Sequence, residues 1–233
     1  MQVIRASLDE VGLEARLSEE KELIYKNTEI SIVYFRAGYM PEQYPSELCW
    51  QGREIIELSK AIKCPDINFH LAGCKKIQQS LNTDMHMFTT DPTSLLQNTT
   101  EIYDFSKISQ EVILRVRNNP KDWVLKPQRE GGGNNTYAEN ILPKLDNFEQ
   151  HPEFILMKMI KCEEKECDTV KAGVVNKMLA VSELGIFGAV VMDGEKIVMN
   201  VYAGYLVRTK SKDSNEGGIA AGYAVIDSAR LVN

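Results

Sequence analysis

The pattern of apolar and polar positions in the first third of the chain predicts a strand followed by a helix. The run 29–35 (EISIVYF) is rich in β-branched and aromatic residues, which predicts a buried strand. Pro45-Ser46-Glu47 is typical of a helix start, with Ser46 as the N-cap. An apolar stripe at helical spacing follows, made of Leu48, Ile55, Leu58 and Ile62. We therefore expect an amphipathic helix that ends at Cys64-Pro65-Asp66.

The second half of the chain alternates strand-like and turn-like segments. A short strand at 123–125 enters a glycine-rich stretch, and a helix is expected over about 138–145. Further strands are expected at 154–157, 178–184, 187–192 and 196–201. Asp193-Gly194 between the last two predicts a hairpin, and the polar stretch 82–100 is a candidate boundary or exposed connection. Strands with interspersed helices indicate an α/β or α+β protein.

Composition narrows the class of protein and of partner. The chain has 233 residues, 43% apolar and 26% charged, as one large or two small globular domains would. Its 27 Lys and Arg against 33 Asp and Glu give a net charge of −6, which predicts neither nucleic acid nor an anionic membrane as a partner. Five cysteines without a CxxC pair, and no apolar signal segment near Met1, predict a cytoplasmic protein.

The segment 126–135 (KPQREGGGNN) is the first candidate for chemistry. Three glycines allow successive N–H groups to approach an anion. Lys126 and Arg129 add positive charge, and Glu130 offers an oxygen ligand suited to Mg²⁺. The segment matches neither the Walker nor the Rossmann pattern. A flexible surface turn is the alternative interpretation.

Two later segments carry a second set of charges. The alternation of a strand places Arg208 and Lys210 on one face, and the small-residue loop 215–222 follows them. Glu183, in the segment 182–188 (SELGIFG), is either a carboxylate that faces a metal or ribose, or an exposed strand end. A solvated sheet edge is the alternative for the basic strand.

Taken together, these motifs resemble the C-terminal half of the eukaryotic glutathione synthetase family of ATP-grasp ligases. The matching segments occur in the family's order over nearly the whole chain: 33–41 (VYFRAGYMP), 63–67, 71–76, 126–135, 182–188, 206–210 and 217–222. The resemblance implies an incomplete ATP-grasp α/β fold. Residues 1–90 would form part of the substrate-binding domain, and residues 91–233 the nucleotide-binding and lid portion.

The resemblance also implies a role for each matching position. Glu130 would bind Mg²⁺, and the ATP site would consist of Lys75, Lys126, Gln128, Arg129, Glu130, Gly131, Gly132, Gly133, Asn134, Asn135, Tyr137, Met157, Lys158, Met159, Ile160, Glu183, Lys210 and Glu216. The peptide substrate would contact Arg36, Ala37, Gly38, Tyr39, Arg208, Ile219 and Ala220. Arg208 would be the catalytic residue.

The reaction implied by the resemblance needs no protein nucleophile. In this family ATP phosphorylates the carboxylate of γ-glutamylcysteine, and the glycine amine then attacks the acyl phosphate to give glutathione, ADP and phosphate. Mg²⁺ is the implied cofactor, and the full-length family forms homodimers. Cations around the transferred phosphoryl group and exclusion of water are what such chemistry requires.

Departures from the family pattern keep other functions open. Ala37 stands where the family has an acidic residue, and Met157-Lys158-Met159 replaces its Met-Glu-Lys. The family's enzymes are also about twice as long, so the sequence resembles a truncated ligase. The alternatives are a relative that binds a nucleotide or thiol peptide without turnover, and a fragment with no independent role.

Overall fold

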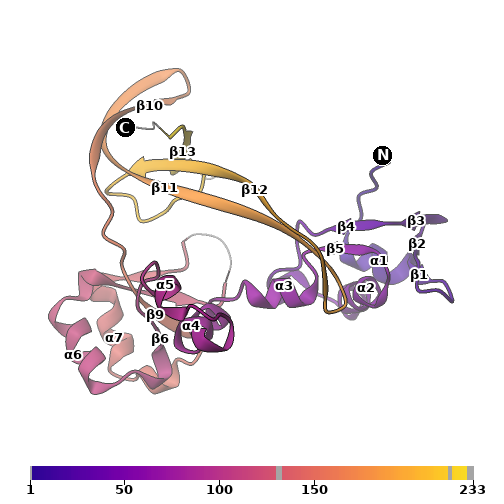
Figure 1. Ribbon diagram of the computed structural model, residues 1–233, viewed down its shortest axis with the longest axis horizontal. Coiled ribbons are helices and arrows are strands. Elements are labelled where there is room, and N and C mark those ends of the chain that lie inside the picture. The colour runs from indigo at the N-terminus through magenta and orange to yellow at the C-terminus, as the bar shows by residue number, and fades with distance from the viewer. Residues whose placement is uncertain (1, 130–132, 220–221, 230–233) are drawn as a thin grey trace. The chain divides into compact units, whose positions relative to one another are not determined.

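The chain folds as two compact units in the computed structural model, which describes residues 2–129, 133–219 and 222–229 (Figure 1). The first unit comprises residues 1–130 and 136–158, and the second comprises 131–135 and 159–233. The predicted division into part of a substrate-binding domain, residues 1–90, and a nucleotide-binding and lid portion, residues 91–233, stays a prediction.

The first 64 residues of the first unit build a small α/β layer with its own core. Three short antiparallel strands form one sheet, two parallel strands form another, and two helices cover them. The buried core consists of Leu23, Phe35, Ile56 and Ala61. The elements are α1 (Leu8–Glu14), β1 (Arg16–Leu17), β2 (Leu23–Tyr25), β3 (Thr28–Ile30), β4 (Ile32–Tyr34), η1 (Pro41–Gln43), α2 (Glu47–Leu58) and β5 (Ile62–Cys64).

The prediction of one buried strand over 29–35 is wrong. The run breaks at Ser31 into β3 and β4, which belong to different sheets. The side chains of Ile32 and Tyr34 are 56% and 63% exposed because β4 pairs only with β5, and this two-stranded sheet leaves them uncovered. Within the run, Phe35 is fully buried in the core, and Ile30 and Val33 pack against it partly buried.

The predicted helix forms, but with another buried face. The Ser46 hydroxyl caps α2 by accepting a hydrogen bond from the Cys49 amide at 3.4 Å, as expected. The helix ends at Leu58 because Ser59 is extended, and Ile62 lies in β5. The predicted apolar stripe is wrong, since Leu48 and Leu58 are 37% and 55% exposed. The face that packs inward is made of Cys49, Gly52, Arg53 and Ile56.

Two glycines explain which side of α2 is buried. A Cβ on Gly52 would overlap the backbone carbonyl of Leu8, and a Cβ on Gly12 would overlap that of Leu48. Backbone atoms of α1 and α2 therefore meet directly at these positions. This close approach turns the 49–56 face of α2 toward α1 and turns Leu48 and Leu58 away.

We predict that Gly52→Ala lowers the free energy of unfolding. In an isolated helix, alanine is more favourable than glycine by about 1 kcal/mol. In this structure the new Cβ would overlap the Leu8 carbonyl, which costs about 1–3 kcal/mol or forces the two helices apart. Urea denaturation should show the net loss. Gly73→Ala is the control, because a Cβ there would lie 3.4 Å from the nearest atom, the His70 carbonyl oxygen. Equal stability of the two variants would contradict the close packing.

The remainder of the first unit is a four-stranded antiparallel sheet with helices. The strand order is β6-β9-β7-β8, and the side chains of Phe105, Val116, Leu125 and Leu156 are 0% exposed in the core. The elements are α3 (Ile67–Ala72), α4 (Lys75–Thr83), η2 (Met85–Met87), α5 (Pro92–Leu96), β6 (Ile102–Asp104), η3 (Phe105–Lys107), α6 (Gln110–Asn118), η4 (Pro120–Asp122), β7 (Trp123–Pro127), β8 (Thr136–Tyr137), η5 (Ala138–Ile141), α7 (Leu142–Leu145), η6 (Phe148–Gln150) and β9 (Phe154–Lys158).

Most of the predictions for this region are confirmed. The strands expected at 123–125 and 154–157 are β7 and β9. The expected helix over 138–145 is a 3₁₀ turn, η5, that continues as the single α-turn of α7. The polar stretch 82–100 is largely exposed and carries short helical turns.

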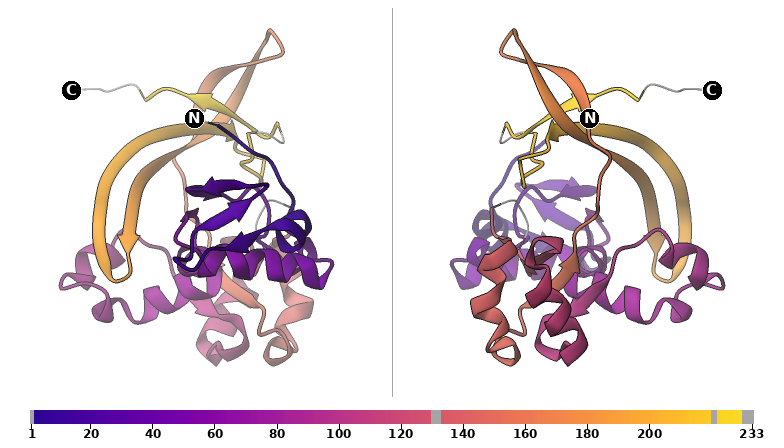
Figure 2. Two further views of the ribbon diagram at one scale, coloured as in Figure 1. Left: turned by 90° about the vertical axis from the view of Figure 1, so that its right-hand side faces the viewer. Right: turned by 90° about the vertical axis from the view of Figure 1, so that its left-hand side faces the viewer.

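The second unit is built on one long hairpin. Its sheet has the order β10 (Lys165–Lys171), β11 (Val174–Asp193), β12 (Lys196–Ser211) and β13 (Ala224–Asp227), all antiparallel. Figure 2 shows β11 and β12 as a curved ribbon. The strands predicted at 178–184 and 187–192 are one continuous strand, β11. Irregularities at 187/188 and 191/192 shift its register with β12 without ending the pairing. The hairpin turn at Asp193-Gly194 is confirmed, with Gly194 at φ 58°.

Helices long and apolar enough to cross a bilayer do not occur in the described part of the chain.

Candidate functional site

In the first unit, the start of α4 lies beside the end of β7. The Lys75 ammonium donates a hydrogen bond to the Arg129 carbonyl oxygen at 2.6 Å. The amide of Lys76 donates to the Gln128 side-chain oxygen at 3.0 Å, and the Gln128 amide group donates to the Glu153 carbonyl at 3.3 Å. Lys75, Gln128 and Arg129, which the resemblance assigns to one ATP site, are therefore neighbours in space.

Strand register places three more candidates on one face of the sheet. Val124 of β7 is paired with Met157 of β9 and with Tyr137 of β8. Partners in antiparallel strands share a face, and side chains alternate along each strand. Lys126, two residues from Val124, therefore lies on the same face as Tyr137 and Met157. The other face carries Leu125 and belongs to the buried core.

Arg129 is held by a carboxylate that the sequence did not indicate. Its guanidinium forms an ion pair with the Glu42 Oε1 at 2.6 Å. A hydrogen bond from its own backbone amide, together with the Arg129 guanidinium, lowers the pKa of the Glu42 carboxyl. Both side chains are about half exposed, at 47% for Arg129 and 59% for Glu42. A bound anion would compete with Glu42 for this guanidinium.

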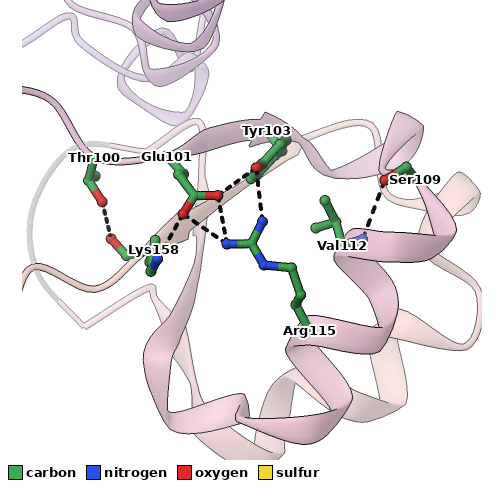
Figure 3. A network of polar contacts seen from close by, with 7 residues as sticks. All are labelled: Thr100, Glu101, Tyr103, Ser109, Val112, Arg115 and Lys158. Atoms are coloured by element: carbon green, nitrogen blue, oxygen red, sulfur yellow. Dashed lines mark hydrogen bonds and ion pairs between the residues drawn. The ribbon is translucent and has the colours of Figure 1, made fainter. Parts of the chain in front are cut away.

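Lys158 belongs to a charge network around Glu101 (Figure 3). The Lys158 ammonium donates to Glu101 Oε1 at 2.8 Å, Arg115 donates to both carboxylate oxygens at 2.8 Å, and the Tyr103 hydroxyl donates to Oε2 at 2.6 Å. Burial raises the pKa of the Glu101 carboxyl, but these hydrogen bonds outweigh it and lower the pKa to about 2. The backbone of Lys158 is engaged as well, since its carbonyl accepts from the Thr100 hydroxyl at 2.9 Å.

We predict that Glu101→Gln destabilises the first unit at neutral pH and not in strong acid. A carboxyl whose folded pKa lies near 2, below its ordinary 4.5, stabilises the fold above pH 4.5 and loses that contribution as the pH falls toward 2. The expected loss at pH 7 is about 1 kcal/mol, since the network is partly exposed. Urea denaturation at pH 7 and at pH 2 measures the loss of stability, with the exposed Glu149→Gln as the control. A loss that persists at pH 2 would contradict the network's role.

In the second unit, cross-strand register joins Glu183, Arg208 and Lys210. Glu183 of β11 is paired with Arg208 of β12, and their side chains form an ion pair. Lys210 lies two residues beyond Arg208 and therefore on the same face. On the opposite face, Thr209 is 3% exposed, and its hydroxyl contacts Ser182 Oγ at 2.8 Å and donates to Asp227 Oδ2 at 2.6 Å. These polar contacts link β11, β12 and β13 on the face opposite the charged side chains.

The two glycine-rich loops of this unit are joined by a hydrogen bond. The Gly133 amide donates to the Glu216 Oε1 at 2.9 Å. The Glu216 backbone is held by Ser214, which donates to its carbonyl at 2.9 Å. Gly217 lies next to the carboxylate of Glu183, since a Cβ there would be 4.0 Å from Oε2. The segments 133–135, 183, 208–210 and 214–217 thus form one neighbourhood.

Other predicted residues are less tightly placed. In the turn after β4, Arg36 and Ala37 are exposed, and Gly38 is buried. Half-buried Ile219 accepts a hydrogen bond from the Gly222 amide at 2.9 Å. Met159 and Ile160 begin the second unit, with Ile160 66% exposed. The predicted residues Glu130, Gly131, Gly132 and Ala220 lie outside the described residues.

Comparisons with known proteins first define the class. A solved structure of a glutathione synthetase-like effector from Globodera pallida matches with a TM-score of 0.67 at 20% identity, covering 94% of this chain and 46% of that chain. The predicted fold class is confirmed: a mixed α/β chain that forms part of an ATP-grasp ligase fold.

The family follows from sequence. The model for the ATP-binding domain of eukaryotic glutathione synthase matches residues 9–231. The chloroplastic glutathione synthetase of Arabidopsis thaliana is 38% identical over 99% of this chain and 44% of its own length. The glutathione synthetases of Mus musculus and Homo sapiens are 38% and 37% identical over 97% of this chain and 50% of their own lengths. The chain belongs to the eukaryotic glutathione synthase family, and spans about half the length of these relatives.

Sequence reasoning missed the carboxylates that bind the candidate cations. Glu42 follows the 33–41 motif directly, so its nearness to the peptide turn was visible in the sequence, but its pairing with Arg129 was not. Glu101 had one indirect signal: position 158 carries a lysine where the resemblance leads us to expect a glutamate. Separations of 87 residues for Arg129 and Glu42 and 57 for Lys158 and Glu101 place both pairs beyond local patterns.

Proposed function

We propose that this chain carries the ATP-binding part of a glutathione synthetase. The reaction is the ATP-dependent ligation of glycine to γ-glutamylcysteine through an acyl phosphate, with glutathione, ADP and phosphate as products. The observation that carries the proposal is the pairing of Glu183 with Arg208 beside the linked glycine loops, on the face that also bears Lys210. This combines two cations with backbone donors in the manner that phosphoryl transfer demands.

The side chains of each unit suit particular steps. In the first unit, Lys75, Lys126 and Arg129 bring positive charge to the end of β7, where the phosphates of ATP would bind. In the second unit, Arg208 would stabilise the negative charge that develops as the substrate carboxylate is phosphorylated. The glycine-rich segments would supply amide donors and exclude water, which would otherwise hydrolyse the acyl phosphate.

Mg²⁺ is the expected cofactor, with Glu130 as its ligand. Across residues 2–129, 133–219 and 222–229, no three His, Cys, Asp or Glu side chains gather into one cluster. Mg²⁺ at a nucleotide site is usually held by only one or two protein carboxylates together with phosphate oxygens and water, so a single ligand such as Glu130 is compatible with the proposal.

Assembly and location are proposed from the family and the composition. We infer a homodimer, as in the full-length family, and a cytoplasmic location, with γ-glutamylcysteine, glycine and ATP as partners. Two plant relatives are named as chloroplastic, so an organelle is the alternative location.

A second candidate is a relative that binds a nucleotide or thiol peptide without turnover. Lys158 favours it, because it stands where the resemblance leads us to expect a glutamate, and its ammonium is engaged by Glu101. Ala37, in place of the family's acidic residue, points the same way.

Release of ADP by the purified chain decides between the two. The assay contains Mg-ATP, γ-glutamylcysteine and glycine, with each omitted in turn. ADP release that requires glycine supports the ligase and overturns the binding-only candidate. A folded chain that binds Mg-ATP and releases no ADP overturns the ligase for this chain.

We predict that Arg208→Ala lowers the rate of ADP release about 100-fold or more, since it removes a cation that acts in the transition state. The affinity for ATP, measured by calorimetry, should change less than about threefold, because Arg208 is assigned to the peptide substrate and not to the nucleotide, and loss of its exposed ion pair with Glu183 costs little stability. Arg117→Ala is the matched control: Arg117 is also an exposed arginine paired with a carboxylate, Asp146 at 2.6 Å. A 100-fold loss in the control would show that exposed arginines act through stability.

We predict that Glu42→Gln raises the affinity for ATP by about two- to fivefold, because it frees Arg129 from a surface ion pair worth about 0.5–1 kcal/mol. The gain should shrink at high salt, which screens exposed charges. Calorimetric titration with ATP at two salt concentrations tests this, with the exposed Glu54→Gln as control. An unchanged affinity at low salt would show that Arg129 does not meet the phosphates.

A further inference from the structure

The turn at 36–39, which the proposed function assigns to the peptide substrate, is built around the side chain of Gln43. The Gln43 Oε1 accepts hydrogen bonds from two consecutive amides, Gly38 at 2.7 Å and Tyr39 at 2.8 Å. Consecutive N–H groups that converge on one oxygen define a concave backbone geometry that is lost if either peptide rotates. A single side-chain atom therefore fixes both peptide planes in the middle of the turn.

The other polar groups of the turn are also held from within the first unit. The Tyr44 hydroxyl donates to the Gly38 carbonyl at 2.9 Å, and its ring stacks on Trp50 of α2 with centroids 4.0 Å apart. The Tyr39 hydroxyl donates to the Phe35 carbonyl at 2.7 Å. Gly38 has φ 89°, and a Cβ there would lie 2.8 Å from the Tyr44 hydroxyl. The turn thus has one conformation that its contacts specify.

Phe35, the residue before the turn, is held in place by side chains of α2. Phe35 is 5% exposed, and the guanidinium carbon of Arg53 lies 4.1 Å from its ring centroid. Arg53 is itself held by Glu57, with Nε to Oε1 at 2.8 Å. Because Phe35 is fixed from α2 and Tyr39 is fixed by Gln43, the backbone that carries exposed Arg36 has little freedom.

We propose that Gln43 is a positioning residue for the peptide substrate: it orders the 36–39 turn so that Arg36 and Tyr39 are held ready to bind γ-glutamylcysteine. The inference rests on the proposed function, and adds a residue outside the matching motif to it. Gln43 acts through the two amides and need not touch the ligand. Preorganisation of this kind improves affinity because the turn need not be ordered when the ligand binds.

The test uses the full 233-residue chain and two variants of one position. Gln43→Leu keeps the size of the side chain and removes the acceptor, which leaves two half-buried amides without a partner. Gln43→Glu keeps an oxygen that can accept from both amides. Gln51→Leu, at an exposed position on α2, is the control for an added leucine. Calorimetry measures the affinity for γ-glutamylcysteine and, separately, for ATP, and hydrogen exchange measures protection of the Gly38 and Tyr39 amides.

The expected result is selective for one ligand. Gln43→Leu should weaken γ-glutamylcysteine binding about tenfold, as the loss of two hydrogen bonds to ordered amides implies, and leave ATP binding unchanged. Both amides should exchange faster in this variant. Gln43→Glu should restore protection and most of the affinity. A merely structural role would weaken both ligands together and would not be rescued in this way.

Two negative results are distinguishable. If the unaltered chain binds γ-glutamylcysteine and Gln43→Leu binds it equally well, the positioning role is overturned and the proposed function stands. If the unaltered chain does not bind γ-glutamylcysteine, the substrate assignment itself fails and the inference falls with it. Equal loss of ATP and peptide binding in Gln43→Leu also overturns the positioning role.

Discussion

The antiparallel pairing of β7 with β9 fixes where the candidate nucleotide residues stand. It sets Leu125 opposite Leu156 in a core from which water is excluded, and a shift of one strand by one residue would carry its leucine out of that core. Burial therefore locks the register, and the register in turn places Lys126 and Met157 on the other face. The positions of charged groups in the first unit depend on apolar residues that take no part in chemistry.

Charge pairing is the second constraint, and it recurs in both units. Glu101 holds Lys158 and Arg115, Glu42 holds Arg129, and Glu183 holds Arg208. Each pair is partly exposed, so each is weak in water and responds to salt. The cations remain fixed in place while no anion is bound, and a polyanion can displace the carboxylates at small cost. The same arrangement suits a ligase and a binding protein.

Close backbone approach shapes the parts of the first unit that hold the 36–39 turn. Gly12 and Gly52 let α1 meet α2, and that contact decides which side of α2 faces inward. The Tyr44 hydroxyl reaches the turn because its ring stacks on Trp50 of the same helix. The orientation of α2 and the shape of the 36–39 turn are thus linked through direct contacts.

The sequence by itself determined the elements whose signals are local. The Ser46 cap, the Asp193-Gly194 hairpin, the strand at 123–125 and the alternation of Arg208 and Lys210 are all confirmed, because caps, turns and strand periodicity involve residues close along the chain. The family could also be read from its motifs. Their assignment to ATP and peptide binding stays a prediction.

Only the tertiary structure decided what depends on contacts distant in sequence. The run 29–35 breaks into two strands because Ile32–Tyr34 pairs with 62–64, and α2 buries another face because Gly52 meets α1. The partners of Arg129 and Lys158 come from 87 and 57 residues away. A local pattern records which residues can form a helix or strand, whereas the partner that buries one face or neutralises one charge is chosen by the fold.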